Sequence, residues 1–308
     1  MERDNPSPVG VVGVGTIGTA MAANLLAAGF TVIGYDVRRE RREVLTELGG
    51  IAATSPGDVA ARARVVLLSL PSVAALEEVV GGEQGLAALA PEGTICVETS
   101  TLPIKDKQDA RAALAGAGVE LLDCTVSGTG AQAREGDIVL YVSGPAAAVD
   151  ECRPVFAAIS RAAPHVGEFG SGTMMKLISN LLVVVHTMAA GEALTLAARC
   201  GLDPAAVLDL LAAGAGNSRM LEVRGPMMAR GEYPGDSATI AVLWKDVELI
   251  LDLATAKDAP TPLLAATVPY FAAARAQGRV GQDPAVLAAV LAGMAGLSTV
   301  PNDRESAG

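Results

Sequence analysis

The sequence predicts an α/β protein in which an N-terminal doubly wound domain is joined by a long helix to an all-helical C-terminal domain. Through the first half of the chain, short apolar runs alternate with helical patterns, as in parallel sheets whose strands are joined by helices. The segment from Thr173 to Cys200 contains no proline and a single glycine, Gly191. The pattern therefore predicts one helix of about 28 residues, roughly 42 Å long. Only helical patterns follow. We therefore expect domain limits of 1–168 and 169–308, with the long helix over 173–200.

The first strand expected is Val9–Val14, which leads straight into a glycine-rich turn and a helical pattern. The strands expected after it are Phe30–Tyr35, Val65–Leu70, Thr94–Val97, Val119–Leu122 and Ile138–Val142. Helices are expected between them near Arg39–Leu48, Val73–Val80 and Lys105–Ala117. Right-handed crossovers between such units imply a largely parallel sheet.

The long helix is expected to stop at Gly201, and Asp203-Pro204 is typical of the start of a new helix. The helices expected beyond it are Ala205–Ala212, Arg219–Arg230, Ile240–Lys257, Leu263–Gln277 and Ala285–Ala295. The tail Val300–Gly308 is expected to be disordered.

Composition narrows the class of protein. The chain has 308 residues, of which 51% are hydrophobic, and a net charge of −11, which disfavours polyanionic partners such as nucleic acid. The uncharged stretch 5–35 is interrupted by six glycines, and the apolar run Ala285–Leu297 is too short to cross a bilayer. Dispersed cysteines are expected to be reduced core residues: Cys96, Cys124, Cys152 and Cys200. These features predict a soluble cytoplasmic protein without a membrane partner.

The run Gly13-Val14-Gly15-Thr16-Ile17-Gly18 has the G-x-G-x-x-G spacing of a dinucleotide-binding turn. Gly13 would allow the tight turn, Gly15 would let backbone N–H groups reach a pyrophosphate, and Gly18 would let the helix pack close to the strand. The start of the helix favours the anion. Thr16 and Ile17 lie between these glycines and are expected to contact the cofactor.

Asp36 ends the second strand, 18 residues beyond Gly18, where a carboxylate can accept a hydrogen bond from a ribose 2′-hydroxyl. A carboxylate repels a 2′-phosphate, so Asp36 favours NAD over NADP. Arg38 and Arg39 lie just beyond it and soften that preference, so NADP is not excluded.

Lys176 is the candidate acid–base group. Met174, Met175, Leu177 and Ile178 flank it near the start of the long helix, and Asn180 follows one turn later on the same face. An apolar setting destabilises an ammonium and suits a lysine to proton transfer near neutral pH. A lysine that reaches out to solvent from an amphipathic helix would have the same spacing, and both interpretations stay open.

Two segments that follow strands are candidate ligand loops. Residues 123–130, Asp-Cys-Thr-Val-Ser-Gly-Thr-Gly, offer small side chains, hydroxyls and backbone N–H groups at the carboxyl end of a strand, where α/β sheets bind ligands. This loop could hold a carboxylate or be an ordinary turn. Thr99-Ser100-Thr101 is a similar candidate for cofactor contacts. His165 and His186 are expected to be structural, and no spacing typical of a metal site is found.

Several motifs occur together along nearly the whole chain: G-V-G-T-I-G-x-x-M-A-x-N-L at 13–25, Leu70-Pro71, Thr99-Ser100-Thr101, D-C-T-V-S-G-T at 123–129, Gly136, Val142-Ser143-Gly144, G-S-G-T-M-M-K-L-I-S-N at 170–180 and Lys245-Asp246. In this order they resemble the β-hydroxyacid dehydrogenase family, which includes 3-hydroxyisobutyrate dehydrogenase and tartronate semialdehyde reductase. The resemblance implies a Rossmann fold for the N-terminal domain and a homodimer or homotetramer assembled through the helical domains.

The resemblance also implies roles for single residues. Lys176 would be the catalytic acid or base and Asn180 would bind the substrate. Ser127, Gly128 and Thr129 would hold the substrate carboxylate. The cofactor would contact Leu70, Pro71, Ser100, Thr101 and Lys245. The implied reaction is hydride transfer between a nicotinamide cofactor and a short β-hydroxy acid, or reduction of the matching semialdehyde, in a cleft at the domain junction.

Two departures from the family pattern bear on the substrate. Thr129 stands where glycine is usual, and Ser179 stands where the first asparagine of an Asn-Asn pair is usual. Two other functions are considered: an imine reductase, against which Lys176 argues because those enzymes typically lack this lysine, and a non-catalytic NAD-binding module.

Overall fold

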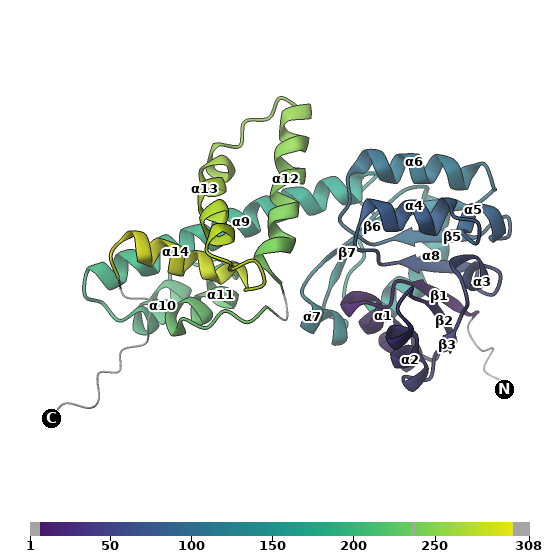
Figure 1. The fold of residues 1–308 in the computed structure, drawn as a ribbon, viewed down its shortest axis with the longest axis horizontal. Helices are drawn as coiled ribbons and strands as arrows, with labels where there is room; N and C mark the ends of the chain where they lie inside the picture. Colours follow the sequence, from purple (N-terminus) through teal and green to yellow (C-terminus); the bar gives the residue numbers. More distant parts are fainter. Residues whose placement is uncertain (1–6, 236–237, 298–308) are drawn as a thin grey trace. The chain divides into compact units, whose positions relative to one another are not determined.

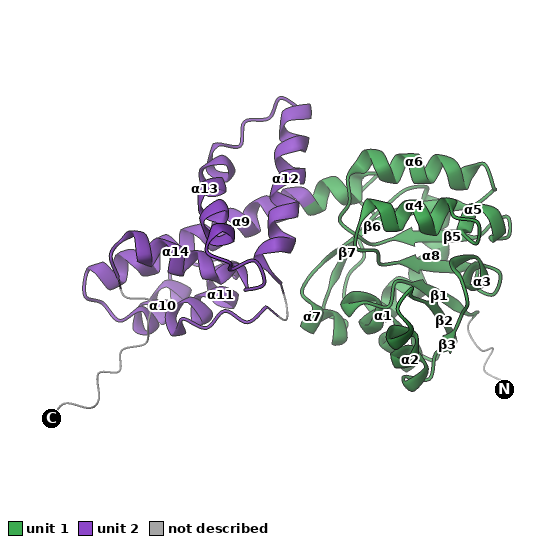
Figure 2. Cartoon of the chain, in the orientation of Figure 1, with its two compact units in different colours: residues 1–176 green, residues 177–308 purple. Residues whose placement is uncertain are grey.

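The structure is a computed structural model that describes residues 7–235 and 238–297. It divides into two compact units, Met1–Lys176 and Leu177–Gly308, which are coloured separately in Figure 2. The division falls inside helix α9 (Ser171–Arg199), later in the chain than the limit of 168 expected from the sequence. The tail expected to be disordered, 300–308, lies outside the described residues.

The first unit is built on a single sheet. Among the described residues seven strands are hydrogen-bonded in the order β3-β2-β1-β4-β5-β6-β7. All neighbours are parallel except β7, which is antiparallel to β6. The bounds are β1 (Val9–Val12), β2 (Val32–Tyr35), β3 (Ile51–Ala52), β4 (Val65–Leu68), β5 (Ile95–Glu98), β6 (Glu120–Ser127) and β7 (Val139–Ser143). The strand order reverses at β1, which is where sheets of this class bind their ligands.

Alternate strand residues supply two separate cores, one on each face of the sheet. Val11 of β1 and Leu67 of β4 belong to one core, whereas Val12 and Leu68 belong to the other. All four are essentially inaccessible to solvent, and burial of each stabilises the fold by about 1.5–3 kcal/mol. Because both faces are covered, the strands are continuous apolar runs rather than alternating ones.

Helices cover both faces, and Figure 1 shows α4 and α6 on one side of the sheet and α1 on the other. Residues of α1 and α8 contribute to the first core, and residues of α3, α4 and α6 to the second. The helices of this unit are α1 (Thr16–Ala27), α2 (Arg39–Glu47), α3 (Pro56–Ala60), α4 (Val73–Gly81), α5 (Leu86–Leu89), α6 (Ile104–Ala115), α7 (Gly130–Arg134) and α8 (Ala146–Ile159).

The second unit contains helices and no strand among its described residues. Besides the greater part of α9 it contains α10 (Pro204–Ala213), α11 (Arg219–Arg230), α12 (Ile240–Ala256), α13 (Pro262–Ala276), the 3₁₀ helix η1 (Pro284–Val286) and α14 (Leu287–Met294). Its main core joins Val184 of α9 to Val247 of α12, Phe271 of α13 and Leu287 of α14. The predicted α/β domain followed by a helical domain is therefore confirmed.

Helix α9 has the length and composition of a membrane-crossing helix, with 29 residues and a mean hydropathy of 1.7 over its most apolar window. Its buried side chains nevertheless belong to the protein interior, since Leu177, Val184 and Met188 pack into the core of the helical unit. Of its most apolar window, 39% is buried inside the protein.

The structure differs from the sequence expectations mainly in short or interrupted elements. Strand β6 runs on to Ser127, so most of the loop expected over 123–130 is strand, paired with β7. Helix α8 was not expected, and it contains Pro154, which disfavours a helix interior. The two-residue strand β3 and the short helices α3, α5 and α7 were not expected either, because each has too few residues for a periodic pattern.

Candidate functional site

The glycine-rich turn between β1 and α1 has the geometry expected of a dinucleotide-binding turn. Gly13 has a φ of +89°, a conformation that residues with a side chain rarely adopt. A Cβ atom at Gly18 would lie 1.9 Å from the backbone oxygen of Gly13, so only glycine lets α1 pack this closely. At Gly15 a Cβ atom would meet nothing within 4 Å, so the turn is open on that side.

The start of helix α1 is suited to an anion. Its N-cap is Gly15, which has no side chain to cap the helix, and its first turn contains no acidic residue. Thr16 and Ile17 begin the helix, and Thr16 is exposed. The first N–H groups of a helix need acceptors and carry the positive end of the helix dipole, so a pyrophosphate would satisfy both needs.

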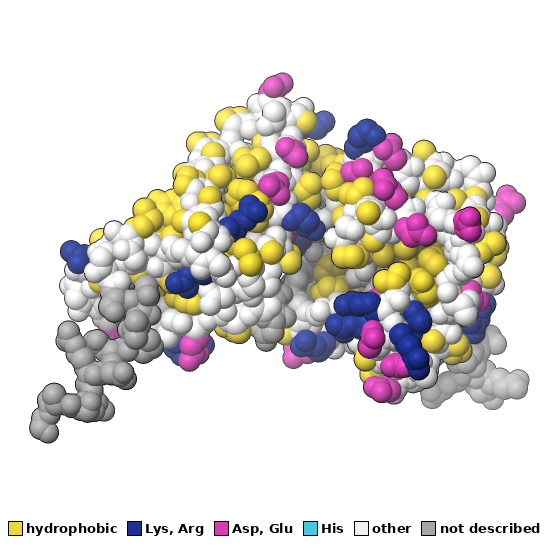
Figure 3. Space-filling model, in the orientation of Figure 1, with side chains coloured by type: hydrophobic (Ala, Val, Ile, Leu, Met, Phe, Trp, Pro, Cys, Tyr) yellow, Lys and Arg dark blue, Asp and Glu magenta, His cyan; other side chains and the backbone are white. Residues whose placement is uncertain are grey.

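Asp36 lies where β2 ends and is 7% exposed. One carboxylate oxygen accepts a hydrogen bond from the Val14 N–H at 2.9 Å, and the other accepts from the Arg38 N–H at 2.9 Å. The Arg42 guanidinium donates to the Asp36 backbone oxygen at 2.5 Å. Asp36 thus holds the glycine-rich turn against the end of β2. In Figure 3, Lys and Arg side chains gather on the surface over the region of α1 and α2.

The ends of β4 and β5 are joined through Ser100. Its hydroxyl accepts a hydrogen bond from the Leu70 N–H at 2.7 Å, and its own N–H donates to Glu98 at 2.9 Å. The structure therefore brings Leu70 and Ser100 together at the sheet edge expected to bind the cofactor. Pro71, which is exposed, and Thr101, which is partly buried, are their chain neighbours.

The segment expected to bind a carboxylate lies at the end of β6. Ser127 is the last residue of this strand, and Gly128 and Thr129 lead into α7. Thr129 caps α7: its hydroxyl accepts from the Gln132 N–H at 3.3 Å, while its own N–H donates to the Gln132 side chain at 3.0 Å. This capping box gives Thr129 a structural use that the sequence pattern did not reveal.

Helix α9 begins against β6 and β7. The Gly172 N–H donates to the Ser143 hydroxyl at 2.9 Å, and the Thr173 N–H donates to the Asp123 carboxylate at 2.7 Å. Both N–H groups belong to the first turn of the helix, where backbone N–H groups have no acceptor within the helix. The helix dipole also favours a carboxylate at this position. Lys176, which is partly buried, follows Thr173 by three residues.

A buried ionic cluster beneath this turn was not foreseen from the sequence. The Lys107 ammonium lies 2.6 Å from a Glu98 carboxylate oxygen and 2.8 Å from one of Asp123, and all three side chains are fully buried. Burial by itself lowers the pKa of Lys107, but the two carboxylates outweigh it, so the pKa is raised and the ammonium stays charged. The signal for this cluster lies in α6, whose buried face consists of Lys107, Ala110 and Leu114.

In the helical unit Asn180 is held by a neighbouring helix. Its side-chain amide nitrogen lies 2.6 Å from an Asp246 carboxylate oxygen of α12, and both residues are buried. An amide NH₂ group carries two hydrogens, so it can donate one to Asp246 and the other to a ligand. Lys245 precedes Asp246 on α12, with its ammonium 3.9 Å from that carboxylate.

The remaining titratable candidates show no comparable grouping. His165 Nε2 lies 2.9 Å from the Gly144 backbone oxygen and 3.0 Å from that of Gly167, contacts that support the structural role expected for it. Cys96, Cys124 and Cys152 are buried free thiols, whereas Cys200 is exposed, so the expectation that all four are core residues was wrong for Cys200. It follows the last residue of α9 and lies at the helix end. Within residues 7–235 and 238–297 no three His, Cys, Asp or Glu side chains are grouped as metal ligands.

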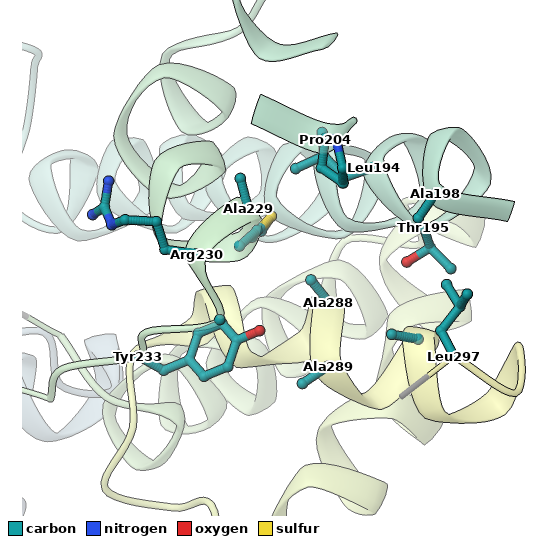
Figure 4. Close-up of a pocket in the computed structure, with 13 residues that line it drawn as sticks. Leu194, Thr195, Ala198, Pro204, Ala229, Arg230, Tyr233, Ala288, Ala289 and Leu297 are labelled. Atoms are coloured by element: carbon teal, nitrogen blue, oxygen red, sulfur yellow. The ribbon is translucent and has the colours of Figure 1, made fainter. Parts of the chain in front are cut away.

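A pocket of about 250 Å³ lies within the helical unit (Figure 4). Most of its lining is apolar, including Leu194, Met228 and Ala288, and none of the predicted site residues lines it. The Arg230 side chain extends away from the cavity and donates to Glu232 at 3.1 Å. We therefore do not place an anionic substrate there.

Comparison with known proteins assigns a family to each part of the chain. Residues 8–168 match the NAD-binding domain of 6-phosphogluconate dehydrogenase, and residues 170–291 match the NAD-binding domain of NADP-dependent 3-hydroxyisobutyrate dehydrogenase. L-threonate dehydrogenase of Cupriavidus necator is 35% identical over 93% of this chain and 96% of its own length. NAD-dependent L-serine dehydrogenase of Pseudomonas aeruginosa is 29% identical over 91% of this chain and 96% of its own length. Among solved structures, a 3-hydroxyisobutyrate dehydrogenase from Salmonella typhimurium superimposes with a TM-score of 0.83 at 30% identity, covering 92% of this chain and 100% of that one.

Proposed function

We propose how this chain acts, starting from its family: it belongs to the β-hydroxyacid dehydrogenases and is an NAD(P)-dependent dehydrogenase acting on CH–OH groups. In the proposed reaction, Lys176 moves the hydroxyl proton of a short hydroxy acid. The carboxylate of that acid is held at the end of β6. The limits 1–168 for the cofactor domain and 169–308 for the helical domain are part of the proposal.

One contact carries the proposal: the 2.7 Å hydrogen bond from the Thr173 N–H to the Asp123 carboxylate. Lys176 lies three residues after Thr173, and Ser127 lies four residues after Asp123. This buried hydrogen bond fixes the start of α9, which carries Lys176, against β6, the strand that ends at Ser127. A hydroxy acid needs both groups, since its carboxylate and its reacting hydroxyl are separated by only two or three bonds.

The first turn of α1 is the part of the chain that would hold the pyrophosphate of a dinucleotide. It has no capping side chain and no acidic residue, and a Cβ atom at Gly15 would meet nothing within 4 Å, so an anion can approach the backbone closely there. The bound nicotinamide ring supplies hydride acceptance or donation. Leu70, Pro71, Ser100 and Thr101 are proposed to line its groove, together with Lys245.

We propose NAD as the preferred cofactor. The Asp36 carboxylate lies at the end of β2, where it would accept a hydrogen bond from a ribose 2′-hydroxyl and repel a 2′-phosphate. Arg38, whose Nε lies 3.5 Å from that carboxylate, reduces the repulsion. NADP is therefore expected to bind more weakly.

Lys176 is proposed to act on the substrate hydroxyl. As a neutral amine it accepts the hydroxyl proton as the C–H hydride leaves, and in the reverse direction its ammonium protonates the forming alkoxide. Asn180, steadied by Asp246, would bind the same hydroxyl or its neighbour. Ser127, Gly128 and Thr129 would bind the carboxylate through their backbone N–H and hydroxyl groups, although the Thr129 N–H already donates to Gln132.

The first candidate substrate is L-threonate, because that name belongs to relatives matched over nearly the whole chain. L-Serine and 3-hydroxyisobutyrate are the next candidates on the same grounds. All three are carboxylates of three or four chain carbons that carry a hydroxyl close to the carboxyl group. We further propose a cytoplasmic homodimer or homotetramer with no nucleic-acid or membrane partner.

The test is a spectrophotometric assay of the purified protein at the reduced-nicotinamide absorbance band. NAD and NADP are tried separately with L-threonate, L-serine, 3-hydroxyisobutyrate and, in the reverse direction, short semialdehydes. We expect NAD-dependent turnover of at least one carboxylate, and loss of turnover with its amide analogue. Reduction of a cyclic imine, without turnover of any hydroxy acid, would contradict the proposal.

A further inference from the structure

Lys107 is a fully buried side chain, and its ammonium has four partners. It lies 2.6 Å from the Glu98 carboxylate and 2.8 Å from the Asp123 carboxylate, and it donates to the Ser100 backbone oxygen at 2.6 Å and to the Thr173 hydroxyl at 3.0 Å. An ammonium has three hydrogens, so these four contacts use its full donor capacity.

The four partners belong to the segments that carry the proposed site residues of this unit. Ser100 is the residue whose hydroxyl holds the Leu70 N–H, in the cofactor segment. Asp123 belongs to β6, the strand that ends at Ser127. Thr173 belongs to the first turn of α9, one turn before Lys176. One lysine on α6 therefore joins the cofactor segment, the carboxylate-binding strand and the helix of the acid–base group.

The stability of the fold does not require a buried ionic cluster at this position. Taking charges out of water costs several kcal/mol per ion, and a buried ion pair is often no more stabilising than apolar side chains of the same volume. The surrounding positions of α6, Ala110 and Leu114, are apolar and show what a purely structural interior would contain. What an ion cluster adds is direction, because each hydrogen bond fixes the position of its partner.

We propose that Lys107 is a positioning residue, which holds the Ser100 segment, the end of β6 and the first turn of α9 in the one arrangement that places Lys176 beside a substrate bound at Ser127. This inference rests on the proposed roles of Lys176 and Ser127, and it adds a residue that touches neither substrate nor cofactor.

Thr173 offers the cleanest test. Its hydroxyl accepts from Lys107 at 3.0 Å and donates to Asp123 at 2.8 Å. Thr173→Val keeps the shape of the side chain and leaves Lys107 paired with both carboxylates, so no charge is left buried alone. Thr173→Ser keeps the hydroxyl and is the matched control. A second variant, Lys107→Met with Glu98→Gln, removes one charge of each sign and leaves the net charge of the cluster unchanged.

Two quantities are measured on each full-length variant. Hydrogen exchange with mass spectrometry reports the opening of the peptides that cover 123–130 and 171–177. Steady-state kinetics, normalised to the number of cofactor-binding sites, separates kcat from KM. We expect Thr173→Val and the double variant to exchange at least tenfold faster in both peptides and to lose at least tenfold in kcat. Cofactor affinity is expected to stay within threefold of wild type in Thr173→Val, which leaves the contact between Lys107 and the Ser100 backbone oxygen in place. Thr173→Ser is expected to stay within threefold throughout.

The outcomes that overturn the inference are distinct from those that overturn the proposed function. Unchanged exchange in Thr173→Val, or faster exchange with an unchanged kcat per cofactor site, would show that the cluster is merely structural. An inactive wild-type protein would contradict the proposed function but leave the exchange rates to decide whether Lys107 holds the three segments together.

Discussion

Asp36 and Asp123 each serve two purposes at the residue scale. Asp36 accepts hydrogen bonds from the Val14 and Arg38 N–H groups and so shapes the turn beside which its charge is proposed to select the cofactor. Asp123 accepts from the Thr173 N–H while its charge is balanced by Lys107. In both cases the carboxylate fixes a piece of backbone, so a change of side chain alters local geometry as well as charge.

Asp36→Asn tests the cofactor preference. The amide oxygen can still accept one backbone hydrogen bond, but the negative charge that repels a 2′-phosphate is lost. We expect the ratio of kcat/KM for NADP to that for NAD to rise roughly tenfold, equivalent to about 1.4 kcal/mol. Asp109→Asn is the control, because it removes the same charge from a carboxylate of α6 that is 64% exposed and pairs with Lys105. A ratio that is unchanged in Asp36→Asn would argue against selection by this charge.

Thiol reactivity is predicted to depend on burial. Burial raises the pKa of Cys96 and of Cys152 to about 12 and raises that of Cys124 well above its usual value, so these thiols stay protonated and unreactive at pH 8. Cys200 is exposed. Titration with Ellman's reagent is expected to detect one thiol in the native protein, none in Cys200→Ser, and all four after denaturation of the wild type. Rapid reaction of a second native thiol would contradict this account.

At the scale of elements, the start of α9 explains two glycine-containing motifs of the sequence. A Cβ atom at Gly172 would lie 2.4 Å from the Tyr141 backbone oxygen and 2.6 Å from that of Asp123, so the helix begins in direct contact with the backbones of β6 and β7. Ser143, in the Val142-Ser143-Gly144 motif, supplies the hydroxyl that caps the same turn. The helix is thereby fixed to the sheet before it enters the helical unit.

Gly172→Ala is predicted to be strongly destabilising, because backbone oxygens on two strands cannot move aside for a methyl group. We expect a loss of about 2–4 kcal/mol in the free energy of unfolding, measured by urea denaturation. Gly81→Ala is the matched control: it lies in helix α4, nothing is within 4 Å of its added Cβ, and alanine there is expected to be neutral or stabilising by up to about 1 kcal/mol. Equal stability of the two variants would refute the close-contact argument.

The sequence predicts the long and strongly patterned elements well and the short ones poorly. The β1 strand, the glycine turn and Asp36 were all identifiable, because their chemistry is local and their spacing is fixed. The Lys107 cluster was missed, since its partners come from 16 and 66 residues away and their meeting depends on strand order. The capping role of Thr129 was missed because a capping box and a ligand loop use the same residue types.

At the scale of the whole molecule, the helical unit displays large apolar side chains. Ile178 and Leu182 lie one turn apart on α9 and are 55% and 50% exposed, and Leu210 of α10 is 75% exposed. Exposed apolar side chains that are neighbours on one helix face, such as Ile178 and Leu182, are common at interfaces between subunits. We therefore propose that this face of α9 contributes to the interface of a homodimer or homotetramer.

Light scattering coupled to size-exclusion chromatography is expected to give two or four times the 31.1 kDa of one chain. Leu182→Asp would place a charge in the proposed interface and is expected to shift the mass toward that of a monomer. Leu89→Asp, at a 49% exposed leucine of the first unit, is the control and is expected to leave the mass unchanged. A wild-type protein that is monomeric in solution would contradict the proposed homodimer or homotetramer.

Lys176 is proposed to move the proton in a hydride transfer to or from a nicotinamide cofactor. The most direct measurement compares wild type with Lys176→Ala and Lys176→Arg in turnover of the best substrate of the panel, with cofactor affinity measured by the fluorescence of the reduced nicotinamide. We expect cofactor affinity within threefold of wild type and a loss of roughly 10²–10⁴ in kcat for both variants, since arginine keeps the charge but cannot give up its proton. A kcat within threefold of wild type in Lys176→Ala would contradict the proposed role.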